Sequence, residues 1–259
     1  MRSLGPVLTF TPLDPNINGF HSIPRRSPVA LLTQDQPISN SVVTEDSATR
    51  LSFLQKVYSL FLLGLFTAIG GVFITLTHPD FAVAVLSHPW IGLIVYFGVF
   101  FACMALRKTP GVNVLALLGF TFVSGVFLSP VLMAVAAKTG GSMDLVYEAA
   151  GITVSIFVGL TAFTFISKKD FSYLGGFITI GLFAVIGIML VNMFVRSAAA
   201  DLAVAWVSSV LFSFFILYDT SRIMRTHESD EYVSGALSLY LDFINLFLAI
   251  LRILSSRRN

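Results

Sequence analysis

The main pattern along this chain is a series of long apolar runs, separated by short segments that carry charges, prolines and glycines. A helix needs about 20 mainly apolar residues to cross a lipid bilayer, and the runs are close to that length. They lack the alternation of apolar and polar residues that is typical of membrane-spanning strands. We therefore predict transmembrane helices at residues 52–76, 90–106, 112–136, 148–166, 172–195, 202–223 and 232–254.

Composition assigns these runs to a membrane protein. The chain has 259 residues, of which 56% are hydrophobic and 12% are charged, and its mean hydropathy is +0.85. Soluble domains carry about 25% charged residues, so this chain has too few charges to cover a surface in water. We predict an all-α integral membrane bundle of seven transmembrane helices that has the lipid bilayer as a partner. The net charge of +2 gives no indication of nucleic-acid binding.

The first fifty residues differ from the rest of the chain. They hold six of the ten prolines, mixed with Ser, Thr, Asn and Asp. They contain no continuous apolar segment of the kind that a secretory signal peptide needs. We therefore predict a disordered tail at residues 1–50, followed by the seven-helix membrane domain at residues 51–259.

Glycines and one proline predict how the helices pack and bend. Glycine lets helix backbones approach closely in a membrane, and Pro130 inside the third run is expected to kink or locally open that helix. We expect close helix contacts at Gly70, Gly71, Gly175, Gly176, Gly181 and Gly187.

The distribution of Lys and Arg predicts the orientation, because cytoplasmic loops carry an excess of both. One side carries Arg50, Lys56, Arg107, Lys108, Lys168, Lys169, Arg222 and Arg225, and the other carries Lys138 and Arg196. This places the N-terminus in the cytoplasm and, after seven crossings, the C-terminus on the opposite side. Arg257 and Arg258 do not fit that side, which a short or partly re-entrant last helix would explain.

Two aspartates stand inside the last two apolar runs. Asp242 lies about 15 Å into the last run, at a rise of about 1.5 Å per residue. A charge at that depth costs at least about 2.5–3.5 kcal/mol, so its side chain is expected to face the bundle interior. Adjacent helices would bring it to Asp219. It belongs to a small and polar stripe, in which Ser238 and Asn245 are candidate supporting residues: Ser238, Asp242, Asn245, Ala249 and Arg252.

The residues around these aspartates resemble a known family. "LYDTSRI", "ALSLYLDFINLFLAILRIL" and "KKDFSYLGGF" are similar to the bacterial branch of the Bax inhibitor-1 family over residues 51–254. The resemblance implies a multi-pass, pH-sensitive calcium leak channel of the cell membrane, here the bacterial inner membrane. It also implies an aspartate pair at Asp219 and Asp242, and a gating arginine at Arg107 in "MALRKTPG". The second run lacks the acidic residue that bacterial calcium-leak members carry there.

The aspartate pair suggests a mechanism. Two carboxylates in a low-dielectric site cannot both ionise cheaply, so they share a proton and hydrogen-bond the last two helices together. Loss of the proton makes the two charges repel, and Asp219 could then turn to Arg107. Calcium prefers oxygen ligands, so Asp219 and Asp242 are also the candidate metal residues. Protons and calcium are the expected partners, and no resident cofactor is expected.

Two other functions remain open. Bacterial members of this family are linked to a membrane-bound AAA protease, so the chain could be a non-enzymatic regulator of that or another membrane partner. Intramembrane aspartyl proteases also pair aspartates on two neighbouring helices. Their second site has the pattern Gly-x-Gly-Asp, whereas this chain has "LYLD" at 239–242. We therefore expect that the protein is not an enzyme.

Overall fold

The computed structural model describes residues 47–78, 80, 83, 87–225 and 231–257. Within these residues there is no strand, and the predicted all-α class is confirmed. Each predicted run coincides with a helix. The helices are α1 (Ser47–Thr77), α3 (Pro89–Leu106), α4 (Val112–Lys138), α5 (Asp144–Ser167), α6 (Gly175–Val195), α7 (Ala198–Arg225) and α8 (Tyr232–Ser256), with a short 3-10 helix, η2 (Ser172–Leu174), before α6.

Helix lengths fit a multi-pass membrane protein. Six of the described helices are long and apolar enough to cross a bilayer, and α3 is a shorter apolar helix of 18 residues. The last helix, α8, runs for 25 residues without a break, so the short helix is α3. Most of the tail predicted at residues 1–50 lies outside the described residues, and its last four residues begin α1.

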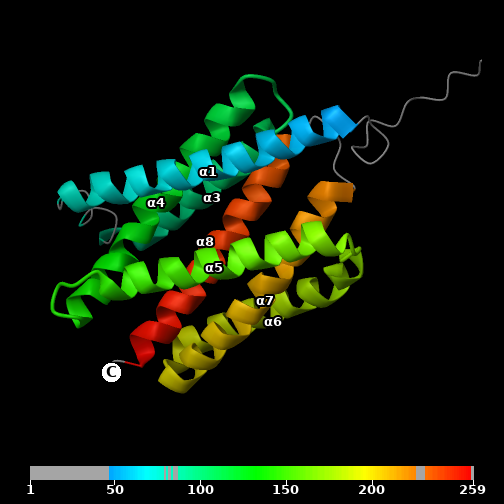
Figure 1. Cartoon of the computed structure of the whole chain (residues 1–259). Helices are drawn as coiled ribbons and strands as arrows, with labels where there is room; N and C mark the ends of the chain where they lie inside the picture. Colours follow the sequence, from blue (N-terminus) through cyan, green and yellow to red (C-terminus); the bar gives the residue numbers. More distant parts are fainter. Residues whose placement is uncertain (1–46, 79, 81–82, 84–86, 226–230, 258–259) are drawn as a thin grey trace, which may run out of the picture. The chain divides into compact units, whose positions relative to one another are not determined.

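Helix α8 forms the centre of the packing. It contacts α1, α4, α5 and α7, and it runs diagonally through the middle of Figure 1, coloured orange to red. Among the six long helices, α8 is the most buried and α6 is the least. Leu239, Tyr240 and Leu246 of α8 are almost completely enclosed. A helix surrounded by other helices has to be apolar on most sides, so the few polar residues of α8 need local partners.

Helices α1 and α4 approach so closely that glycine is required at their contact. A Cβ atom added at Gly125 would lie 1.9 Å from the carbonyl oxygen of Ala68, and one at Gly71 would lie 2.2 Å from that of Phe122. The predicted close contact is therefore confirmed at Gly71, whereas the sequence pattern missed Gly125. Gly175 and Gly181 face side chains of α7. The prediction is wrong for Gly70, Gly176 and Gly187, which have no neighbouring atom within 4 Å.

Pro130 lies inside α4, and the helix continues through it to Lys138. The ring of Pro130 lines a cavity between α3, α4 and α8. Proline cannot donate the backbone hydrogen bond of a helix interior, so this turn of α4 is held with one bond fewer beside an unfilled space.

Candidate functional site

The two predicted aspartates meet at the interface between α7 and α8. Asp219 lies near the end of α7 and Asp242 near the middle of α8, and these two helices pack against each other. The side chains are 8% and 4% exposed, so both carboxyl groups are enclosed by the bundle. Their side chains are hydrogen-bonded to each other. The structure therefore brings together the two residues that the sequence singled out.

Apolar side chains enclose the pair along both helices. Ile216 and Ile223 lie three residues before and four residues after Asp219, and Leu239 and Leu246 have the same spacing around Asp242. Residues with these spacings share a helix face, and all four are 0% exposed. The carboxyl pair thus lies between two apolar layers, one toward each end of the bundle.

The contact between the carboxyl groups requires a proton. An ionised carboxylate can only accept hydrogen bonds, whereas a protonated carboxyl can also donate one. Among the described residues no N–H or O–H group donates to Oδ2 of Asp242, an atom that is shielded from solvent. The hydrogen bond to Asp219 therefore involves the other oxygen of Asp242, and a proton held between the two side chains supplies the donor that this contact needs.

The arginine that acts electrostatically on Asp219 is Arg222, one turn further along α7. Arg107 caps the end of α3, and its carbonyl oxygen accepts a hydrogen bond from Nδ2 of Asn113 at 3.3 Å. No ion pair between the guanidinium of Arg107 and Asp219 or Asp242 is found in the described part of the chain. The structure therefore joins the aspartates to each other and leaves Arg107 apart from them.

Polar contacts that the sequence did not indicate tie the loop after α3 to the start of α8. Lys108 forms an ion pair of 2.6 Å with Glu231, the residue before α8. The amide of Asn113 also donates a hydrogen bond of 3.5 Å to the hydroxyl of Tyr232. These contacts hold the end of α3 beside the start of the helix that carries Asp242.

The two supporting residues of the polar stripe have different surroundings. Nδ2 of Asn245 donates to the carbonyl oxygen of Leu241 at 2.7 Å, and the side chain lines the same cavity as Tyr96 and Ser124. Ser238 is half-buried. The side-chain amide of Asn245 therefore has its hydrogen-bond acceptor within its own helix.

Helices α1, α5 and α7 together contribute a set of buried hydroxyl groups. Tyr58 of α1, Thr161 of α5 and Thr220 of α7 lie close to one another, yet none of these hydroxyls completes a hydrogen bond among the described residues. Buried polar groups without protein partners are typical positions for ordered water. Thr220 directly follows Asp219 along α7, so the hydroxyl cluster lies at a similar level of this helix, on a different face from the carboxyl group. No pattern in the sequence predicts this cluster, because its three residues come from helices that are far apart along the chain.

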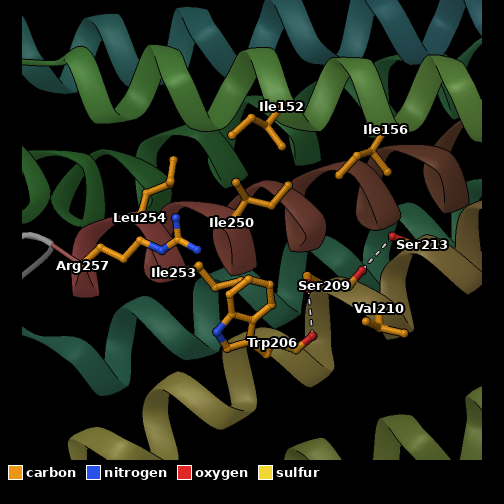
Figure 2. A pocket seen from close by; sticks show the side chains of 10 residues that line it. All are labelled: Ile152, Ile156, Trp206, Ser209, Val210, Ser213, Ile250, Ile253, Leu254 and Arg257. Atoms are coloured by element: carbon orange, nitrogen blue, oxygen red, sulfur yellow. Dashed lines mark hydrogen bonds between the residues drawn. The ribbon is translucent and has the colours of Figure 1, made fainter.

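The carboxyl pair is separate from the cavity shown in Figure 2. That cavity, of about 370 Å³, lies between α5, α7 and α8 and is lined mainly by apolar side chains. Ser209 and Ser213 donate to carbonyl oxygens of their own helix, and Arg257 lies toward the end of α8. Neither aspartate lines it. Among the described residues no group of three or more His, Cys, Asp and Glu side chains could hold a metal ion, so an ion at the pair would meet two carboxyl groups.

Comparison with known proteins gives matches over most of the chain. Residues 50–259 match the family model described as inhibitor of apoptosis-promoting Bax1. A protein named Bax inhibitor 1 from Schizosaccharomyces pombe is 38% identical over 81% of this chain and 78% of its own length. Protein lifeguard 4 of Mus musculus is 33% identical over 88% and 95%. An uncharacterized protein of Campylobacter jejuni is 34% identical over 88% and 98%.

Proposed function

The chain belongs to the Bax inhibitor family over residues 50–259, and we propose that it is a pH-sensitive calcium leak channel whose gate is the carboxyl pair. The observation that carries this proposal is the buried hydrogen bond between Asp219 and Asp242 in a multi-pass membrane bundle. Ionisable residues at such depth usually belong to a path for ions or protons. Helix packing alone does not need a carboxyl group at this position.

With one proton in place the gate is closed. The shared proton connects α7 to α8, and the fully buried apolar layers of Ile216, Ile223, Leu239 and Leu246 flank it along this interface. A hydrated ion cannot cross such layers without losing its water. This state corresponds to the hydrogen-bonded arrangement of the two aspartates.

Loss of the proton reverses the balance of forces. Two unit charges about 4 Å apart repel by about 4 kcal/mol at an effective dielectric constant near 20, whereas a charge-assisted hydrogen bond contributes about 1.5–3 kcal/mol. The hydrogen bond is lost together with its proton, so it no longer opposes the repulsion, and α7 and α8 separate at the pair. Asp219 then turns toward Arg107, which the contacts of Lys108 and Asn113 hold near the start of α8.

The open pair offers oxygen ligands to a cation. Calcium takes about 6–8 oxygen ligands at flexible geometry, and two carboxylates supply up to about four of them. Water reaching the hydroxyls of Tyr58, Thr161 and Thr220 would supply others. Two carboxylates alone bind calcium weakly, which suits an ion that has to leave again. In this proposal calcium is the transported ion, protons control the gate, and the protein has neither a resident cofactor nor an enzymatic activity.

We also propose the orientation and location expected from the sequence. The ends of the helices rich in Lys and Arg, including the start of α1, face the cytoplasm, and the membrane is the bacterial inner membrane. In this orientation Asp219 and Arg107 lie toward the cytoplasmic side. The gate therefore responds mainly to cytoplasmic pH.

Calcium flux into liposomes that contain the purified protein tests the function. We expect flux to rise as pH increases from about 5 to about 8, a range in which buried carboxyl groups release protons. Asp144→Asn is the matched control, because Asp144 is exposed at the start of α5. This control should keep the wild-type pH profile.

The same preparation separates the alternative functions. Folded protein that gives no calcium flux at any pH would contradict the channel and favour a regulator of a membrane-bound AAA protease. Cleavage of a transmembrane peptide that disappears in both Asp219→Asn and Asp242→Asn would favour an intramembrane aspartyl protease.

A further inference from the structure

A charged cavity lies where the ends of α4 and α8 meet the start of α7. It has a volume of about 340 Å³, and its lining includes Lys138, Asp201 and Arg252. The rest of the lining is mostly apolar, with two serines at the end of α8. Lys138, Asp201 and Arg252 belong to three different helices, so the charges gather only in the folded bundle.

The two cations of this cavity have no ionic partner in the described part of the chain. No ion pair within 4 Å joins Lys138 or Arg252 to Asp201, although all three line the cavity. Oδ1 of Asp201 accepts a hydrogen bond of 2.7 Å from Nδ2 of Asn192, which holds this carboxylate in place. The cavity therefore presents two cations and one fixed carboxylate to a ligand.

A second cavity continues the first toward the middle of the helices. Its volume is about 400 Å³, it lies between α3, α4 and α8, and it is lined mainly by apolar side chains such as Leu93, Phe127 and Ile244. Val131 and Leu248 line both cavities, so the two spaces adjoin. Asn245 in the second cavity and Arg252 in the first are separated by about 10 Å along α8, at about 1.5 Å per residue.

We propose that the two adjoining cavities bind one phospholipid with a primary amine in its headgroup. The lipid phosphate lies between Lys138 and Arg252, its ammonium group faces Asp201, and one acyl chain passes Val131 and Leu248 into the apolar cavity. The order of these groups follows the bilayer, in which headgroups lie at the helix ends and acyl chains run toward the middle.

The charges favour this ligand over other lipids. An anionic lipid without an amine would satisfy Lys138 and Arg252, but it would leave Asp201 facing negative charge. A choline headgroup carries a positive charge but has no N–H group to donate to that carboxylate. Phosphatidylethanolamine provides a phosphate for the two cations and three N–H donors for Asp201.

Lipid binding to the full-length protein in detergent tests the proposal by native mass spectrometry. We expect phosphatidylethanolamine to bind more tightly than phosphatidylcholine or phosphatidylglycerol. The double variant Lys138→Gln, Arg252→Gln should bind it at least about tenfold more weakly, because two charge-assisted contacts are lost. Arg257→Gln is the matched control, since this exposed arginine lines the separate cavity of Figure 2, and it should bind the lipid like the wild type.

Two further variants test each half of the site. Asp201→Asn should remove the preference for phosphatidylethanolamine over phosphatidylcholine. Val131→Trp should weaken binding of the whole lipid by filling the passage between the cavities, at a residue that is 43% exposed and so tolerates a larger side chain. Circular dichroism checks that each variant is folded.

Several results would overturn the proposal. Equal affinity for phosphatidylglycerol, or the same loss of binding in Arg257→Gln as in the double variant, would show non-specific attraction to positive charge. Equal binding of the water-soluble headgroup glycerophosphoethanolamine would contradict the acyl-chain cavity. None of these measurements depends on ion conduction, so failure of the proposed channel function leaves this test unaffected.

Discussion

Replacing the aspartates by asparagine tests whether they act as one titrating unit. Asparagine keeps the size of the side chain, and its amide can donate a hydrogen bond to the remaining carboxyl group. It carries no charge, so it removes the repulsion that opens the proposed gate. Asp219→Asn and Asp242→Asn should each keep α7 and α8 together at every pH. Their calcium flux should stay at the low level that the wild type shows at acidic pH.

The size of the effect follows from the two opposing forces at the pair. With the proton, a hydrogen bond of about 1.5–3 kcal/mol favours the closed state, and without it a repulsion of about 4 kcal/mol favours the open state, so titration shifts the balance by about 5.5–7 kcal/mol. At about 1.36 kcal/mol per factor of ten, the ratio of open to closed protein should change by about four to five powers of ten, so wild-type flux should go from almost closed to almost fully open over the titration. Each single variant should change by less than about twofold over the same range.

Flux and thermal unfolding should be measured together on wild type, both single variants and the double variant. If the pair titrates as a unit, the double variant resembles either single variant. In the double-mutant cycle, the interaction term is the effect of the double variant minus the effects of the two single variants. For the pH response this term is then about as large as the effect of one substitution and has the opposite sign. Residues in contact commonly show interaction energies of about 0.5–3 kcal/mol, and the term for this pair should lie at or above the upper end of that range. Asp242→Ala should instead lose about 1–3 kcal/mol of stability, because Asp219 then remains buried without a partner.

One result would refute this reasoning. If the aspartates only hold helices together, the two substitutions should lower the unfolding temperature additively. The pH dependence of flux would then persist in both single variants. That outcome would leave Asp242 as a packing residue and would require another group as the pH sensor.

Three further predictions concern other parts of the molecule. Arg107→Ala should change the pH dependence of flux while the amount of folded protein stays constant, and loss of folding would instead assign Arg107 a structural role. Gly125→Ala should destabilise the protein by about 1–3 kcal/mol through overpacking of α1 and α4, measured by thermal unfolding against Gly119→Ala, which has no neighbour within 4 Å. A phosphatase reporter that is active only outside the cytoplasm should be active when fused after Gly140 and inactive after Lys169, and the reverse pattern would contradict the proposed orientation.

The helices and the aspartate pair could be predicted because each leaves a local signal in the sequence. A membrane span requires a long apolar run, and all seven runs appear as helices with similar ends. Asp242 interrupts such a run, and the cost of burying a lone carboxylate requires a partner. Asp219 was the acidic residue closest to it in a neighbouring helix.

Contacts between distant helices could not be predicted in the same way. Gly125 looks no different in the sequence from Gly119 on the same helix, yet only Gly125 faces the backbone of α1. Whether a glycine lies where two helices cross depends on how the helix is rotated about its own axis. A helix that is apolar on all sides has no sequence pattern that specifies this rotation. The same reason explains why the charges of Lys138, Asp201 and Arg252 were not recognised as one group.

The position of α8 connects the cost of Asp242 to the architecture of the bundle. A carboxyl group at mid-depth is tolerated only where protein encloses it, and a helix at the edge of the bundle would expose one side to lipid. Helix α8 contacts four other helices, and Asp242 is only 4% exposed, so protein covers the side of α8 that carries the carboxyl group. Separation of α7 from α8 would then open the pair inside the bundle and keep it away from lipid. A central position for the helix that carries Asp242 is therefore what a proton-controlled gate inside a membrane requires.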